Sequence, residues 1–251
     1  MSSLLRLGSY HTQPSLASCP PVSACLISLV SFDIPSRRML IVGTCTRALG
    51  AEADALSTRL GTYVDSSRDR ILIRAGTGIC SVYNQILKAA VAEPACEAIV
   101  LLHDDTYILD HNFRAKIVSA FRFDPSLGVI GVVGASGIAS LAWWDGQCKV
   151  GRIYETRGFI DFGSQRGLVD VVDGLLMVIS RRVFARICFD EQSFPGFHGY
   201  DVDYCLQVRK AGFGCMVLPV EVLRRTKGGF GNREEFNRAN QALLAKWRPK
   251  A

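Results

Sequence analysis

Three patterns that mark common classes of protein are absent from this sequence of 251 residues. No run approaches the ~20 apolar residues that span a bilayer, since the apolar run at 22–32 is too short. No Gly-x-Gly-x-x-Gly motif opens the first predicted strand–helix turn, which disfavours a dinucleotide-binding oxidoreductase. The only dense basic run, residues 224–227, is short and stands beside glycines, so nucleic acid is not an expected partner.

The nine cysteines form no Cys-x-x-Cys pair and no metal-ligand spacing. Their odd number in a long chain disfavours a secreted disulfide scaffold and favours free thiols in a reducing compartment. The expected location is therefore the cytoplasm, with peripheral contact to a membrane as an alternative.

The composition is that of a folded domain, with 49% hydrophobic and 21% charged residues. The excess of 29 Lys and Arg over 23 Asp and Glu gives a net charge of +6, which suits an anionic ligand without identifying one. The length is sufficient for one large α/β domain with a buried active site.

From residue 39 onward, short β-branched runs alternate with stretches of helical period. The pattern predicts a single α/β domain with a mostly parallel central sheet and helices on both faces. Predicted strands are 39–44, 70–74, 97–103, 128–133, 168–179 (broken) and 214–218; predicted helices are 47–60, 81–92, 112–123, 181–188 and 201–211.

Three segments fall outside this alternation. Residues 1–38 are rich in Ser and Pro and are expected to be a flexible leader before the domain at 39–222. Residues 136–167 lack a clear period and are predicted to be an irregular lid or binding loop. Residues 223–251 are expected to be a basic loop and a tail helix, which packs on its own domain more often than on a partner or membrane.

Carboxylates occur at three places where an α/β fold binds ligands. Asp104 and Asp105 directly follow an apolar strand, and a hard divalent cation takes one or two carboxylates together with phosphate oxygens. Asp173 precedes a glycine within an apolar run. Asp201 and Asp203 stand at the start of an amphipathic helix. Each motif alone is explained equally well or better by a turn or by the helix dipole.

In their order, these motifs resemble the family 2 type of glycosyltransferase with the GT-A fold, in the branch that has His-Asp-Asp in place of Asp-x-Asp. The resemblance covers roughly residues 70–220 and is specific in order and spacing. The segments that carry it are Ser81-Val-Tyr-Asn84, His103-Asp-Asp105, Asp173-Gly174, Phe189-Asp-Glu191, Gly199-Tyr-Asp-Val-Asp-Tyr-Cys-Leu206 and Lys210-Ala-Gly-Phe213.

The resemblance implies inverting transfer of a sugar from a UDP- or GDP-sugar to an acceptor hydroxyl, assisted by Mn²⁺ or Mg²⁺. Asp201 matches the general base and Asp105 the metal ligand, with Asp104 assisting the metal or lying against the ribose. His103 replaces the first Asp of the usual motif at the donor site. The implied acceptor is a glycan, a lipid carrier or a protein.

Further candidates are placed more loosely around these residues. Asn84 and Asp65 are expected on the donor side, while Arg225 and Lys227, in the stretch where many relatives place a metal-binding His, would neutralise the diphosphate. Acceptor contacts are expected from five residues: Asp173, Trp143, Trp144, His198 and Tyr200. Because neighbouring residues of a strand face opposite sides, at most one of the two tryptophans is expected to contact the acceptor.

Two other functions fit part of the pattern. A non-catalytic GT-A-like domain that binds a nucleotide sugar or glycan would explain the His at position 103 and the missing later His. A metal-dependent nucleotidyltransferase would need a Gly-rich phosphate loop near the first strand, of which residues 43–47 carry only a trace.

Overall fold

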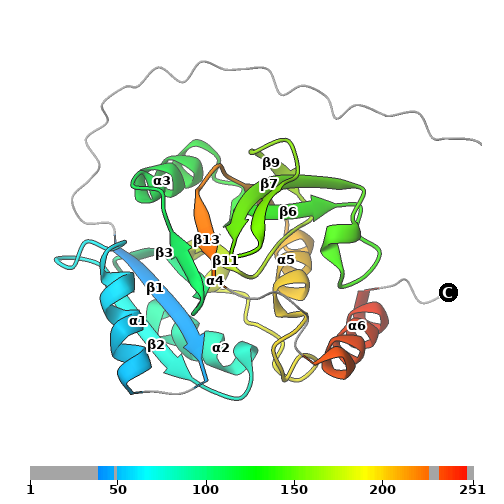
Figure 1. The fold of residues 1–251 in the computed structure, drawn as a ribbon, viewed down its shortest axis with the longest axis horizontal. Helices are drawn as coiled ribbons and strands as arrows, with labels where there is room; N and C mark the ends of the chain where they lie inside the picture. Colours follow the sequence, from blue (N-terminus) through cyan, green and yellow to red (C-terminus); the bar gives the residue numbers. More distant parts are fainter. Residues whose placement is uncertain (1–38, 48–49, 226–231, 248–251) are drawn as a thin grey trace, which may run out of the picture. The chain divides into compact units, whose positions relative to one another are not determined.

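Seven strands form the central sheet of the computed structural model, which describes residues 39–47, 50–225 and 232–247 (Figure 1). β1 (Met39–Thr46) lies between β2 (Arg70–Ala75) and β3 (Cys96–His103), and the three strands are parallel. β1 and β3 are almost continuously apolar because both faces of these strands are buried. The predicted α/β fold with a mostly parallel sheet is confirmed.

The other half of the sheet contains two strands that run opposite to the remaining five. β11 (Leu176–Ser180) is antiparallel to both β3 and β5 (Leu127–Gly131). β12 (Gly214–Val217) is parallel to β5, and β9 (Gly167–Val169) completes the sheet as an antiparallel strand. The broken strand predicted at 168–179 corresponds to β9, the two-residue β10 (Val171–Val172) and β11.

Three of the helices pack on one face of this sheet. α2 (Ile79–Val91) contacts β1, β3 and the short α4 (Arg181–Phe184). A Cβ on Gly128 of β5 would clash with side chains of both α4 and α5 (Tyr200–Lys210), which places those helices on the same face. α1 (Ala51–Gly61) contacts β2, and α3 (Phe113–Phe123) contacts β5.

A second sheet, which the sequence did not predict, lies beside the central one, and its strands are hydrogen-bonded in the order β10-β6-β7-β13-β4. Its members are β4 (Thr106–Ile108), β6 (Val133–Ser136), β7 (Cys148–Glu155), β10 and β13 (Val222–Arg224), and β8 (Gly158–Asp161) pairs with β7. The prediction of an irregular loop at 136–167 is therefore wrong. The strand signal was weak because β8 is largely exposed, only two residues of β7 are buried, and β7 pairs partly with β13, which is distant in sequence.

The predicted helix at 181–188 ends at Phe184, four residues early. Beyond this end, the side-chain amide of Asn84 accepts a hydrogen bond from the Phe189 N–H and donates one to the Phe189 carbonyl oxygen, at 2.9 and 3.0 Å. These two bonds fix the backbone at Phe189 outside the helical path, with the chain running on toward α5.

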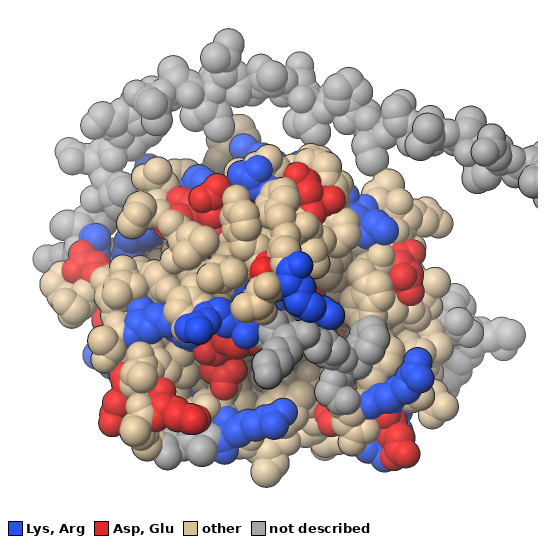
Figure 2. Space-filling view, in the orientation of Figure 1, with Lys and Arg blue, Asp and Glu red and all other residues tan. Residues whose placement is uncertain are grey.

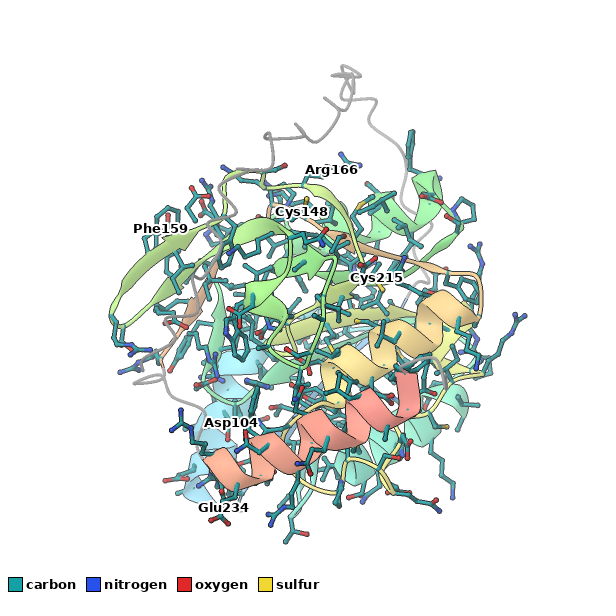
Figure 3. All side chains as sticks on the ribbon, turned by 90° about the vertical axis from the view of Figure 1, so that its right-hand side faces the viewer. Asp104, Cys148, Phe159, Arg166, Cys215 and Glu234 are labelled. Carbon is teal, nitrogen blue, oxygen red and sulfur yellow. The ribbon has the colours of Figure 1, made fainter. Side chains whose placement is uncertain are left out.

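The tail helix α6 (Arg233–Trp247) packs on its own domain. Asp203 of α5, only 1% exposed, accepts hydrogen bonds from the Trp247 indole N–H at 2.7 Å and from the Lys246 ammonium at 3.0 Å. Leu243 is buried beneath the helix. Figure 3 shows α6 lying across the molecule, with Glu234 near its start on the side where Asp104 lies.

Replacing the buried Asp203 with alanine is expected to destabilise the fold by about 2–3 kcal/mol, because the half-buried Trp247 N–H and the Lys246 ammonium lose their shared acceptor. This expected loss of stability is at the low end of the range for breaking a buried ion pair, because the Lys246 side chain is 29% exposed. The free energy of unfolding in urea measures it. Trp247→Phe, which removes one donor and keeps the ring, should cost about 1 kcal/mol; equal stability of wild type and Asp203→Ala would exclude this anchor.

All seven cysteines in the described ranges are free thiols, and Cys148 and Cys188 are the two that are exposed. Within the same ranges, no helix combines the length and the apolar character needed to cross a membrane.

Candidate active site

A cleft of about 760 Å³ opens where β1 and β3 end. Parallel strands present their carboxyl ends at one edge of a sheet, so the residues that follow β1 and β3 meet there. Arg47 follows β1, and Asp104 and Asp105 follow β3. The opposite wall is built from the segment before α5 and the start of α6. The structure thus brings together Asp104, Asp105, Asp173, Asp201, His103, Trp143, Trp144, His198 and Tyr200.

Asp105 and Asp104 differ in their surroundings. Asp105 is half-buried, with one carboxylate oxygen (Oδ2) 3.7 Å from Nε of Arg224, whereas its Oδ1 atom is enclosed and has no protein partner among the described residues. Asp104 is exposed, and its main-chain oxygen accepts a hydrogen bond from Arg59 at 2.7 Å. The free oxygen of Asp105 is therefore the better placed of the two to take a cation.

The described residues contain no group of three or more His, Cys, Asp or Glu side chains that would hold a metal unaided. Mg²⁺ and comparable ions are commonly held by one or two carboxylates plus the phosphate oxygens of a substrate. Asp105, with its unpartnered oxygen, and the neighbouring Asp104 fit that kind of shared site.

Asp173 and Asp201 form a carboxyl pair in the cleft. Asp201, in the first turn of α5, accepts a hydrogen bond from the Gly174 N–H at 2.9 Å. Asp173 accepts one from the Trp143 indole N–H and one from the Leu175 N–H, both at 2.8 Å. Burial and the neighbouring charge of Asp173 raise the pKa of Asp201 to about 7. A carboxyl group with this pKa exchanges a proton readily near neutral pH.

Tyr200 connects the carboxyl pair to the end of β3. Its hydroxyl lies 2.6 Å from Nε2 of His103, and the side chain is only 4% exposed. A Cβ on Gly174 would lie 1.9 Å from this hydroxyl, so the residue after Asp173 must be glycine for Tyr200 to reach His103. Burial and the charge of Arg224 lower the pKa of His103, which favours a neutral imidazole. Tyr200, predicted to contact an acceptor, is therefore occupied with His103.

Both tryptophans line the cleft, and the argument that at most one of them contacts the acceptor does not apply to their observed backbone. The expectation assumed a strand, but Trp143–Asp145 forms a 3₁₀ turn in which successive side chains do not alternate. The Trp143 and Trp144 rings meet edge to face with centroids 6.0 Å apart. His198 lies in the same cleft, with its ring 5.6 Å from that of Phe236.

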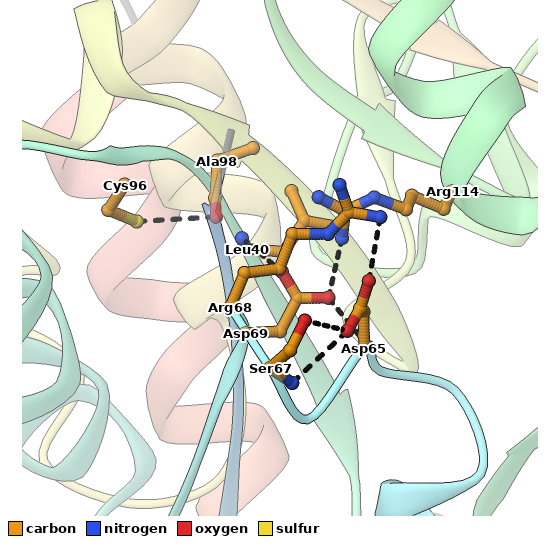
Figure 4. A network of polar contacts seen from close by, with 8 residues as sticks. All are labelled: Leu40, Asp65, Ser67, Arg68, Asp69, Cys96, Ala98 and Arg114. Atoms are coloured by element: carbon orange, nitrogen blue, oxygen red, sulfur yellow. Dashed lines mark hydrogen bonds and ion pairs between the residues drawn. The ribbon is translucent and has the colours of Figure 1, made fainter. Parts of the chain in front are cut away.

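Asp65 lies at the wrong end of the sheet for the donor role predicted for it. It precedes β2, and its carboxylate bonds Ser67 and Arg68 in a network that also joins Asp69 to Arg114 (Figure 4). Asp69 in turn accepts a hydrogen bond from the N–H of Leu40, at the start of β1. The cleft lies at the other end of β1, across a strand of eight residues.

Asn84 is also absent from the residues that line the cleft. Both polar atoms of its amide are bonded to the backbone of Phe189, so in this structure it fixes the chain before α5. It thereby supports the segment that carries Asp201 without facing the cleft itself.

Among the basic candidates, Lys227 lies outside the described residues, and Arg225 does not line the cleft; its guanidinium donates a hydrogen bond to the Tyr107 hydroxyl at 3.1 Å. Arg224 occupies the cleft instead, together with Arg47 and Arg157. Which of two adjacent arginines faces inward depends on the register of β13, which the sequence did not reveal.

Glu155, Phe162, Phe197, Glu235 and Phe236 also line the cleft and were not singled out from the sequence. They come from β7, the segment after β8, the loop before α5 and α6, so no single motif contains them. On the face drawn in Figure 2, acidic and basic side chains are interspersed rather than gathered in one field of one sign.

A sequence profile described as "Glycosyltransferase like family" matches residues 40–238. The chain belongs to this family.

A curated relative is the streptomycin biosynthesis protein StrF of Streptomyces griseus, 31% identical over 160 residues. The match covers 63% of this chain and 56% of StrF, so the chain corresponds to little more than half of that protein's length.

Two solved structures of glycosyltransferases share the fold. The mannosyltransferase PcManGT of Pyrobaculum calidifontis aligns over 78% of this chain and 59% of its own, with a TM-score of 0.50 and 12% identity. GalNAc-T7 aligns over 86% of this chain and 49% of its own, with a TM-score of 0.55 and 10% identity. At these identities the similarity establishes a fold of the GT-A type.

Proposed function

We propose that this chain transfers a sugar from a nucleotide-diphosphate sugar to an acceptor hydroxyl, with inversion at the anomeric carbon. The observation that carries the proposal is the position of Asp201, a carboxyl group with a pKa near 7, in the same cleft as Asp104 and Asp105. Displacement at an anomeric carbon requires a base on one side and a neutralised diphosphate on the other.

The related structures support a nucleotide sugar as donor. PcManGT is described in complex with GDP-Man and Mn²⁺, and GalNAc-T7 with UDP, GalNAc and Mn²⁺. Each places a nucleotide and Mn²⁺ on the fold that this chain shares. UDP- and GDP-sugars are therefore the donors to test first, with Mn²⁺ and Mg²⁺ as the cations.

In the proposed reaction, Asp201 accepts the proton of the acceptor hydroxyl as its oxygen forms a bond to the anomeric carbon. The bond between that carbon and the diphosphate breaks, and the nucleoside diphosphate leaves with the electron pair. This single displacement inverts the configuration and needs no covalent intermediate on the protein. The Gly174 N–H orients the Asp201 carboxylate, and His103, held by Tyr200, borders the donor side.

A divalent ion, when bound, would neutralise charge on the diphosphate oxygens. Asp105 and Asp104 are the residues that would hold it. Arg224, 3.7 Å from Asp105, and the cleft residues Arg47 and Arg157 add positive charge for the same diphosphate. Trp143, Trp144 and His198 border the acceptor side.

Calorimetric titration with UDP, GDP and their sugar conjugates, each with Mn²⁺ or with EDTA, tests the donor. Binding of one nucleotide that strengthens with Mn²⁺ would support the proposal. Binding without any transfer to a panel of acceptors would favour a non-catalytic nucleotide-sugar-binding domain instead. Lack of binding to every nucleotide would exclude the donor class.

The transfer rate is expected to fall as the pH decreases through about 7, because Asp201 must be ionised to accept a proton. Asp173→Asn removes the neighbouring negative charge that helps to raise the pKa of Asp201, so the acidic limb of the pH profile should move to lower pH. Burial still acts on Asp201, so the limb should remain above the ordinary carboxyl range.

Asp145→Asn is the matched control for this profile, since Asp145 is exposed beside Trp144 and does not line the cleft. Its acidic limb should coincide with that of the wild type. An acidic limb that stays in place in Asp173→Asn would show that Asp173 does not govern the titration of the base.

A further inference from the structure

One end of the cleft is walled by aromatic rings, here called the aromatic wall. Its members come from η1 (Trp143–Asp145), the segment after β8, the loop before α5, and α6. They are Trp143, Trp144, Phe162, Phe197, His198 and Phe236. Segments separated by almost 100 residues of sequence therefore contribute rings to one surface.

Contacts between the rings make the wall continuous. Trp143 meets Phe162 edge to face at 6.0 Å between centroids, and Trp144 lies 6.0 Å from Phe236 at an interplanar angle of 33°. Phe236 then meets His198 edge to face. The helix α6 that carries Phe236 is anchored at its end through Asp203 and, beside Phe236, through Glu235, which accepts a hydrogen bond from the Phe197 N–H.

The wall touches the carboxyl pair directly and is chemically distinct from the other end of the cleft. The Trp143 indole N–H donates a hydrogen bond to Asp173. The next residue, Gly174, donates its backbone N–H to Asp201. On the other side of Asp201, Tyr200 and His103 lead to β3, which is followed by Asp105 and its partner Arg224. The proposed base therefore stands between a charged end and an aromatic end.

Aromatic faces beside carboxylate and amide groups suit a sugar ring. A pyranose offers one face of C–H groups that packs on an aromatic ring, while its edge carries hydroxyls that donate to carboxylate oxygens. Two carboxylates beside the wall line the cleft, those of Asp173 and of Glu235, whose Oε1 also accepts a hydrogen bond from the Phe197 N–H. A lipid chain would remove the carboxylates of Glu235 and Asp173 from water without offering them further hydrogen-bond donors, and an extended peptide would need main-chain donors or acceptors along the wall.

We propose that the acceptor presents a saccharide ring and that the aromatic wall, including Phe236 of α6, binds it. This inference rests on the proposed function, because it assigns the acceptor for the same cleft. It narrows the acceptor to a carbohydrate or a glycoside, and it gives α6 a part in substrate selection.

The test measures nucleotide and sugar binding separately on the full chain. UDP or GDP with Mn²⁺ is titrated first, and then a panel of methyl pyranosides, with gluco, galacto, manno and N-acetylated members, is titrated in the presence of the bound nucleotide. Saturation-transfer NMR identifies which sugar protons lie against the rings. We expect saturable binding of at least one pyranoside, with saturation concentrated on one face of C–H groups.

Phe236→Leu keeps an apolar side chain but removes the ring, and it should weaken pyranoside binding at least tenfold while nucleotide affinity stays unchanged. Phe123→Leu is the matched control, since Phe123 is 79% exposed on α3 and outside the cleft; it should change neither affinity. Thermal unfolding of both variants establishes that they remain folded, and Trp144→Leu provides a second test of the wall.

The outcomes distinguish a failure of the saccharide-acceptor proposal from a failure of the proposed transferase function. Nucleotide binding without binding of any pyranoside, accompanied by transfer to a Ser/Thr peptide or to a polyprenyl phosphate in vesicles, would overturn the saccharide acceptor and leave the proposed function standing. Pyranoside binding that Phe236→Leu and Trp144→Leu leave unchanged would overturn the wall as the subsite. Pyranoside binding without nucleotide binding would overturn the proposed transferase function alone.

Discussion

Asp201→Asn is expected to lower the transfer rate by a factor on the order of 10²–10⁴, the usual loss when a general base is removed. Asparagine matches the shape of aspartate and can still accept the hydrogen bond from the Gly174 N–H, so the start of α5 should stay in place. Nucleotide affinity should remain that of the wild type. The measurement is single-turnover transfer together with calorimetry of the nucleotide.

A control variant and the pH profile separate a loss of the chemical step from a loss of folding. Asp145→Asn carries the same chemical change at an exposed position outside the cleft and should retain the full rate. Asp201→Asn should also lose the acidic limb near pH 7, because the group that titrates there is gone. Turnover of Asp201→Asn close to that of the wild type would remove Asp201 from the role of base.

Asp105→Ala is expected to abolish the effect of Mn²⁺ on nucleotide binding. Its Oδ1 atom is the enclosed carboxylate oxygen at the end of β3 without a protein partner, so it is the oxygen expected to meet the cation. We expect the affinity with Mn²⁺ to fall at least tenfold, about 1.4 kcal/mol, to the value measured in EDTA.

Asp104→Ala distinguishes the two neighbouring acids. Asp104 is exposed, so its loss should weaken the Mn²⁺ effect less than the loss of Asp105 does. Arg224 would remain near the diphosphate in both variants, and some affinity without metal should persist. An Asp105→Ala protein that still binds the nucleotide more tightly with Mn²⁺ than with EDTA would exclude Asp105 as the metal ligand.

The sequence predicted the central sheet well because its strands are buried on both faces and read as continuous apolar runs. β1 and β3 are examples, and the order of acidic motifs along the chain identified which strand end carries the cleft. The second sheet was missed because β8 is largely exposed, only two of the eight residues of β7 are buried, and β13 has only three residues. Weak hydrophobic alternation gives little signal for such strands.

The site residues also differ in whether they adjoin an element that the sequence predicts. Asp104, Asp105 and Asp201 were found because each directly follows or begins a regular element. Arg224 and Phe236 were missed, since their approach to the cleft depends on the register of β13 and on how α6 docks. Asp65 was misplaced because its donor role followed the family resemblance, whereas its position before β2 puts it at the amino end of a parallel strand, away from the cleft.

The docking of α6 has a consequence for how this fold can diversify. The helix meets the rest of the domain largely through side-chain contacts: Asp203 and Asp190 with Lys246, Asn240 with the N–H of Leu141, and Glu235 with the N–H of Phe197. None of its residues belongs to a strand ladder. Exchange of residues 233–247, with these anchors kept, would therefore replace one wall of the cleft while every β-strand pairing stays intact, so that the two ends of the cleft can change independently.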